Sequence, residues 1–107
     1  MDLAELQATL RQFAAQRGWQ AFHTPKNLAM ALMVEAAELL EIFQWMTPEQ
    51  SLAATKDPAS AQHIAQELAD VQIYLLQLAD LAQIDLEQAV RAKLLLNAQN
   101  HPAPPAA

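Results

Sequence analysis

Four carboxylates stand in two pairs with the same internal spacing, and that spacing suits a metal site. Glu35 and Glu38 form the first pair, and Glu67 and Asp70 form the second. Residues three apart lie on the same side of an α-helix, so each pair would share a face. If the two helices cross there, the four acids converge, and carboxylate oxygens are the ligands that Mg²⁺ or Mn²⁺ prefers.

The first pair lies in a stretch, residues 28–46, that is apolar nearly all the way round. Its four polar residues recur at every third position, namely Glu35, Glu38, Glu41 and Gln44. Each step of three falls about 60° short of a full helical turn, so they spread round the helix instead of forming one solvated stripe. A carboxylate held away from water is costly unless it is paired or binds a metal. Solvated surface charge would explain either pair alone. The two pairs together, on two strongly apolar helices, leave a metal site and solvated surface charge as the two interpretations of these residues.

The role of Glu41 stays open, because it lies on the flank of the first pair. It could be a further ligand, a support for one of the ligands, or a surface residue. A di-iron bundle also gathers carboxylates, but it uses Glu-x-x-His on two of its helices. Here His63 precedes Glu67 by four residues, so the order of the side chains disfavours a di-iron site.

Capping signals in the sequence predict an all-α protein built from about four long helices and one short helix. The chain has one glycine, is rich in Ala, Leu and Gln, and shows no strand-like alternation. Asp2 with Glu5, and Thr47 with Gln50, match a capping box, and Gly18 fits the position just past a helix end. The predicted helices are 3–17, 25–46, 48–54, 58–81 and 86 to 97 or 99. Residues 1–100 would form one helical domain, and residues 101–107 a flexible Pro/Ala tail.

Composition excludes several classes of protein. There is no cysteine, which rules out disulfides, zinc thiolates and a cysteine nucleophile. The net charge of −6 disfavours binding to a nucleic-acid polymer. The N-terminus is acidic where a signal peptide would be basic, and no apolar run is long enough to span a membrane. We therefore expect a cytoplasmic protein that binds no membrane.

Other candidate residues flank the acids. Trp19, Phe22 and His23 lie in a predicted loop, where they could line a pocket or simply cover the edge of the core. A polar series follows one side of the fourth helix: His63, Glu67, Asp70, Tyr74 and Gln77. Lys93 and Asn97, four apart, would share a face of the last helix.

Three motifs in the sequence resemble those of a known family. They are Phe22-His23-x-Pro25-Lys26-Asn27-Leu28, Glu35-x-x-Glu38-Leu39-x-Glu41-x-Phe43-Gln44-Trp45 and Glu67-Leu68-x-Asp70-Val71-x-Ile73-Tyr74-Leu75. Together they resemble the ExxE…ExxD pattern of MazG-like all-α nucleoside triphosphate pyrophosphohydrolases, and specifically the dCTP pyrophosphatase branch. One departure is Asn100-His101-Pro102, where members of this branch often have a basic residue followed by Tyr-Pro.

The resemblance implies Mg²⁺-dependent hydrolysis of a nucleoside triphosphate, dCTP or a modified dCTP, to the monophosphate and pyrophosphate. It implies that Glu35, Glu38, Glu67 and Asp70 bind the metal and that Glu35 or Glu38 accepts the proton of the attacking water. It also implies a nucleotide pocket and a phosphate or sugar contact made by Trp19, His23, Trp45, Tyr74, Lys93 and Asn97. Lys26 is a secondary candidate.

The resemblance further implies a homodimer, or a dimer of dimers, with sites built between subunits. The residues point the same way, because a helix that is apolar on most sides needs more cover than one chain of this length provides. Two alternatives remain at this stage. One is the same chemistry on dUTP or another nucleotide, and the other is a non-catalytic helical module that dimerises through residues 28–46.

Overall fold

Side-chain caps mark the start of every α-helix in the computed structural model, which describes residues 1–105. The helices are α1 (Leu3–Gln16), η1 (Gln20–Phe22, a 3₁₀ helix), α2 (Pro25–Phe43), α3 (Pro48–Ala54), α4 (Pro58–Leu81) and α5 (Leu86–Asn100). Their caps are Asp2, Thr24, Thr47, Asp57 and Asp85, each accepting a hydrogen bond from a backbone N–H three residues on. The predicted all-α fold is confirmed, and part of the predicted tail, residues 106 and 107, lies outside the described residues.

Several helix boundaries differ from the prediction. The helix predicted to reach residue 46 ends at Phe43, because the chain tightens there into a turn in which the N–H of Met46 donates to the carbonyl of Phe43. The last helix runs on to Asn100, beyond the predicted end at 97 or 99. The segment predicted as a loop before α2 contains η1. The capping box at Thr47 is complete, whereas at Asp2 the described hydrogen bonds include only the half accepted by the aspartate.

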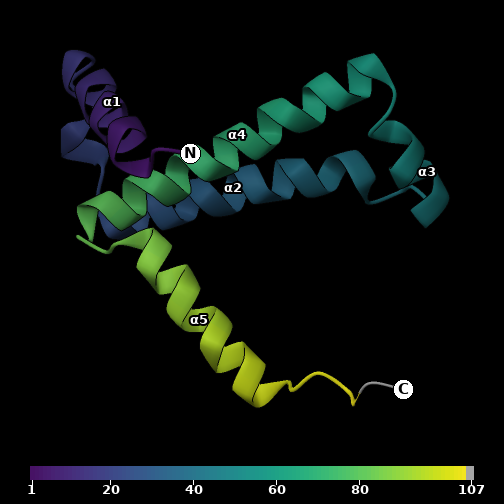
Figure 1. The fold of residues 1–107 in the computed structure, drawn as a ribbon. Coiled ribbons are helices and arrows are strands. Elements are labelled where there is room, and N and C mark those ends of the chain that lie inside the picture. Colours follow the sequence, from purple (N-terminus) through teal and green to yellow (C-terminus); the bar gives the residue numbers. More distant parts are fainter. Residues whose placement is uncertain (106–107) are drawn as a thin grey trace.

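Two long antiparallel helices form the centre of the structure. Figure 1 shows α2 lying alongside α4, with α3 joining them at one end and α1 resting on α4 near the other. The buried residues are few and small or aliphatic: Ala14, Leu28, Ala54, Leu76 and Ala79. Leu28 and Leu76 place the densest packing at the end of the α2–α4 pair that α1 covers.

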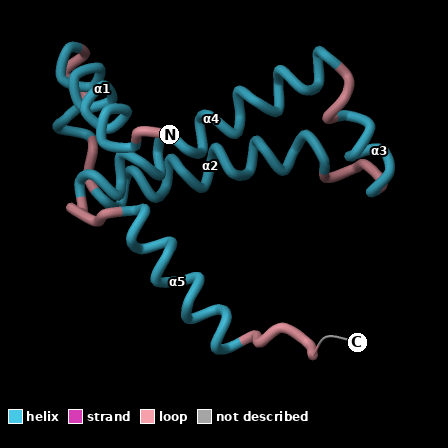
Figure 2. Tube along the Cα trace, in the orientation of Figure 1, coloured by secondary structure: helices cyan, strands magenta, loops and turns pink. Residues whose placement is uncertain are grey.

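The last helix stands apart from this pair. In Figure 2, α5 leaves the end of α4 and extends away from the α2–α4 pair. None of its fifteen residues, all of them within the described part of the chain, is buried. No helix within residues 1–105 is long and apolar enough to cross a membrane.

Candidate functional site

Three of the four predicted carboxylates meet between α2 and α4. One carboxylate oxygen from each of Glu35, Glu38 and Glu67 lies within 4.8 Å of the others. Oε2 of Glu35 and Oε2 of Glu67 are buried, and neither accepts a hydrogen bond from any described residue. Buried oxygens without donors are unfavourable, so this arrangement calls for a cation or a donor that completes it.

The crowding of these acids disturbs their ionisation. The pKa of Glu35 is raised to about 7, first by removal from water, then by its close contact with Glu38, and then by the like charges of Glu38, Asp70 and Glu67. Removal from water also raises the pKa of Glu67, with Glu38 as the next cause. The folded chain alone therefore lacks the positive charge that these carboxylates need.

Asp70 lies beside this group, and His63, one turn before Glu67 on α4, contacts Glu67. Asp70 is half-buried, and its charge contributes to the raised pKa of both Glu35 and Glu67. Nε2 of His63 is 3.5 Å from Oε1 of Glu67, whereas the buried oxygen of that carboxylate is Oε2. His63 can therefore orient Glu67, as residues behind a metal ligand commonly do.

A cavity of about 210 Å³ opens next to the acids. Its lining includes Glu35 and Asp70 together with three of the predicted nucleotide contacts, Trp19, His23 and Tyr74. Leu10, Phe13, Ile73 and Gln77 complete the lining. Aromatic walls beside carboxylates provide both a stacking surface and a metal-binding edge, which are the two things a nucleotide requires.

The turn after α1 holds Trp19 at this cavity. Gly18 has φ +68°, and the N–H of Trp19 donates to the carbonyl of Ala14 at 3.0 Å, which closes the helix end in a Schellman motif. The ring of Phe13 meets the indole edge-on with 5.7 Å between centroids, and Arg17 lies 3.4 Å above the Phe13 ring. The predicted position of Gly18, just past the end of a helix, is thus confirmed.

Three other predicted contacts lie away from the cavity within one chain. Trp45 follows the far end of α2 and is 89% exposed. Lys93 and Asn97 lie on the exposed α5, which departs from the α2–α4 pair.

Sequence reasoning gave no role to several residues that the structure brings to the site. Phe13 and Leu10 belong to the apolar face of α1, and their part in the cavity depends on how α1 crosses α4. Gln77 carried a signal, because it continues the polar series of Asp70 and Tyr74 on α4. The carbonyl oxygen Oε1 of Gln77 is buried and has no hydrogen-bond partner among the described residues.

The fold and the acidic cluster define an all-α protein with a carboxylate site between two antiparallel helices. A family model described as the MazG-like family matches residues 30–106. The chain belongs to the MazG-like family. The pyrophosphatase from Archaeoglobus fulgidus DSM 4304, a solved structure, superposes with a TM-score of 0.89 at 40% identity, covering 96% of this chain and 94% of that chain.

Curated relatives agree with the family. The dCTP pyrophosphatase 1 of Homo sapiens is 40% identical over 102 residues, which cover 95% of this chain. The protein of the same name from Mus musculus is 41% identical over 101 residues, or 94% of this chain. The chain spans 58% of the length of each of these relatives. The predicted resemblance to MazG-like proteins and to the dCTP pyrophosphatase branch is confirmed.

Proposed function

We propose that this protein hydrolyses dCTP, or a modified dCTP, between the α and β phosphorus atoms, releasing dCMP or its modified form and pyrophosphate. The observation that carries the proposal is the meeting of Glu35, Glu38 and Glu67 beside an aromatic cavity. Relatives at about 40% identity that are named dCTP pyrophosphatase 1 support the substrate. Removal of unwanted nucleotides from the cellular pool would be its role.

The carboxylate cluster fits a divalent metal ion, and we assign it Mg²⁺ with Mn²⁺ as a substitute. The fit rests on the two buried oxygens of Glu35 and Glu67 that accept no hydrogen bond from residues 1–105. Glu38 and Asp70 would complete the ligand set. Mg²⁺ prefers carboxylate oxygen and retains water, and when bound it would neutralise phosphate charge and lower the pKa of a water.

The chain's own residues then have distinct tasks. The four acids would hold the metal ion between α2 and α4, because direct contact between these acids and a triphosphate without a cation would be strongly repulsive. Glu35 or Glu38 would accept the proton of the water that attacks the α-phosphorus. Glu35 is suited to this because it belongs to the acidic cluster and also borders the cavity where the nucleotide would lie.

The nucleoside would occupy the cavity lined by Trp19, His23 and Tyr74. Trp19 and Tyr74 provide faces for the base or sugar, and His23 a polar edge. Trp45, Lys93 and Asn97 would reach the nucleotide of a neighbouring subunit, since their own chain holds them away from its cavity. The working unit would therefore be a homodimer or a dimer of dimers.

The test is a nucleotide panel at equal concentration, with dCTP beside dUTP, dTTP, dATP, dGTP and CTP, with and without Mg²⁺. We expect Mg²⁺-dependent release of pyrophosphate and a monophosphate, with dCTP fastest. Release of orthophosphate and a diphosphate would refute the α–β cleavage. Pyrophosphate release led by another nucleotide, such as dUTP, would keep the chemistry and change the substrate.

A further inference from the structure

Gln77 is a polar residue of the cavity that the proposed mechanism leaves without a task. It lies on α4 one turn beyond Tyr74 and two turns beyond Asp70, on the side of the helix that faces the cavity. Its carbonyl oxygen Oε1 is buried without a hydrogen-bond partner in the described part of the chain. Such an acceptor costs free energy unless a donor arrives, so Gln77 is placed to receive one from a ligand.

The position of Gln77 along α4 matches the length of a nucleotide. Gln77 is seven positions beyond Asp70, which is about 10 Å along the axis of a helix. If Asp70 marks the metal and the α-phosphate, Tyr74 lies level with the sugar and Gln77 level with the far edge of the base. Gln77 also borders a second cavity of about 200 Å³, whose lining includes Arg11 and Asp80. Gln77 thus lies between the two cavities, and the far edge of the base would lie against it.

We infer that Gln77 selects the base by accepting a hydrogen bond from the exocyclic amino group of cytosine. The inference rests on the proposed function and names the group that gives it specificity. Cytosine carries an amino donor at position 4 and an acceptor at position 3, which a glutamine amide meets with its oxygen and its NH₂. Uracil and thymine carry a carbonyl at position 4 and an N–H at position 3, so they would pair only with an amide that has turned over. In the orientation that the structure shows, with Oε1 as the buried atom, their carbonyl would meet a second acceptor and both would stay unpaired.

The test compares Gln77→Leu with the wild-type protein on three substrates: dCTP, dUTP and the triphosphate of 2-pyrimidinone deoxyriboside, which lacks the 4-amino group. We expect kcat/KM for dCTP to fall roughly ten-fold in Gln77→Leu, as for loss of a partner to a buried group. The 2-pyrimidinone substrate should change little, because it never made the bond. The ratio of kcat/KM for dCTP to kcat/KM for dUTP should therefore also fall in Gln77→Leu.

Gln77→Glu provides a second variant of almost the same shape. A carboxylate still accepts from an amino group but cannot turn over to donate to a carbonyl, so the preference for dCTP over dUTP should persist. Gln72→Leu is the matched control, since Gln72 is also half-buried on α4 but bonds Met1 and lies outside the cavity. We expect it to leave the ratio of dCTP to dUTP unchanged.

Binding of α,β-imido dCTP and α,β-imido dUTP with Mg²⁺, measured by calorimetry, separates failure of this inference from failure of the proposed function. A wild-type preference for the dCTP analogue that Gln77→Leu abolishes supports the inference without any turnover. An equal fall for all three substrates, or an unchanged ratio in Gln77→Leu, would overturn it while leaving the hydrolase intact. A wild-type protein that neither binds nor hydrolyses nucleotides would overturn both.

Discussion

Glu35 concentrates the unfavourable electrostatics of the site in a single side chain. Its Oε2 is buried without a donor among the described residues, and its pKa is raised to about 7 by removal from water and by three neighbouring acids. A folded-state pKa above the unfolded value of 4.5 means that the folded chain holds a proton that the unfolded chain releases. The stability that this proton supports is present below pH 4.5 and is lost as the pH rises through about 7.

We therefore expect the melting temperature of the metal-free protein to fall between pH 5 and pH 8. Mg²⁺ should raise it strongly at pH 8 and weakly at pH 5, because the metal binds the ionised carboxylate and competes with protons. Circular dichroism melts with EDTA or with millimolar Mg²⁺ at the two pH values measure both effects. This experiment also separates an enzyme from a non-catalytic dimerisation module, for which Mg²⁺ should change little.

Glu35→Gln tests whether the ionisation of Glu35 causes the fall in melting temperature with pH. It removes the titrating carboxylate, so the fall in melting temperature with pH should flatten and the response to Mg²⁺ should shrink. Glu49→Gln, the same change at an exposed position of α3, should behave like the wild type. An unchanged pH dependence in Glu35→Gln would show that other groups, and not this cluster, govern the stability.

At the scale of the helix, two ends use the same geometry with different residues. Gly18, with φ +68°, lies just past the end of α1, and Gln83, with φ +56°, lies just past the end of α4. In each case the N–H of the next residue donates to a carbonyl five residues earlier. A left-handed φ suits glycine and costs other residues about 1 kcal/mol. Gln83 therefore carries strain that Gly18 avoids.

We predict that Gln83→Gly stabilises the protein by up to about 1 kcal/mol, because it relieves this strain. Gly18→Ala should destabilise it by a similar amount through backbone strain alone, since a Cβ at Gly18 meets no atom within 4 Å. Urea denaturation of the two variants measures both changes. Equal stability of Gln83→Gly and the wild type would mean that the end of α4 bears no strain.

Most of the elements could be predicted because their signals are local. Each predicted cap is a side chain that accepts a hydrogen bond from a backbone N–H three residues away. The start of a helix can therefore be predicted from a short stretch of sequence alone, as for Thr24 with Pro25 and for Thr47 with Gln50. The spacing of the acids likewise places them on two faces. The left-handed φ of Gln83 has no such signal, because glutamine does not favour this conformation.

The arrangement of elements in space was less predictable, since it depends on contacts between distant segments. Nothing in the sequence of α5 indicates that it would leave the α2–α4 pair, and Lys93 and Asn97 with it. The burial of one oxygen of Gln77 depends on how α1, η1 and α4 meet. The position of Trp45 at the far end of α2 follows from helix length, but its role depends on a second subunit.

As a whole molecule, the single chain is more extended than a protein of its size should be. Its radius of gyration is 17.3 Å, against about 13 Å for a compact chain of this length. Its accessible surface is 8281 Å², against about 5900 Å² for a compact monomer of 11.8 kDa. Large apolar side chains are exposed along α2 and α5: Met30, Met33, Val34, Leu40, Val90, Leu94, Leu95 and Leu96.

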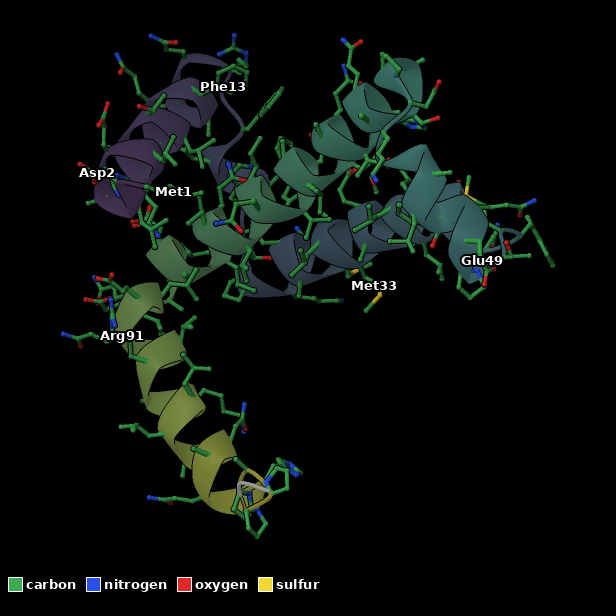
Figure 3. All side chains as sticks on the ribbon, turned by 45° about the vertical axis from the view of Figure 1, so that its right-hand side comes forward. Met1, Asp2, Phe13, Met33, Glu49 and Arg91 are labelled. Carbon is green, nitrogen blue, oxygen red and sulfur yellow. The ribbon has the colours of Figure 1, made fainter. Side chains whose placement is uncertain are left out.

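This surface predicts a dimer at least, with α2 and α5 covered by a second copy. Figure 3 shows Met33 projecting from the side of α2 that faces away from α4, where it is 69% exposed. We expect light scattering at micromolar concentration to give the mass of a dimer or a tetramer. A monomeric mass would contradict the prediction.

Met33→Glu tests which surface forms the dimer. A charge buried in an apolar interface is costly, so this variant should dissociate into smaller species and lose stability. Gln12→Glu adds the same charge on the exposed side of α1 and should keep the mass of the wild type. If Met33→Glu also keeps that mass, α2 is not the interface.

The most direct test of the central claim is the Mg²⁺-dependent release of pyrophosphate from dCTP by Glu38→Gln and Asp70→Asn. Both substitutions keep the size of the side chain and remove the charge that would hold the metal. We predict that each lowers turnover by at least about a hundred-fold, with helicity and assembly mass unchanged, while Glu49→Gln retains full activity. Mg²⁺-dependent turnover at the wild-type rate in both variants would show that these acids are not the site.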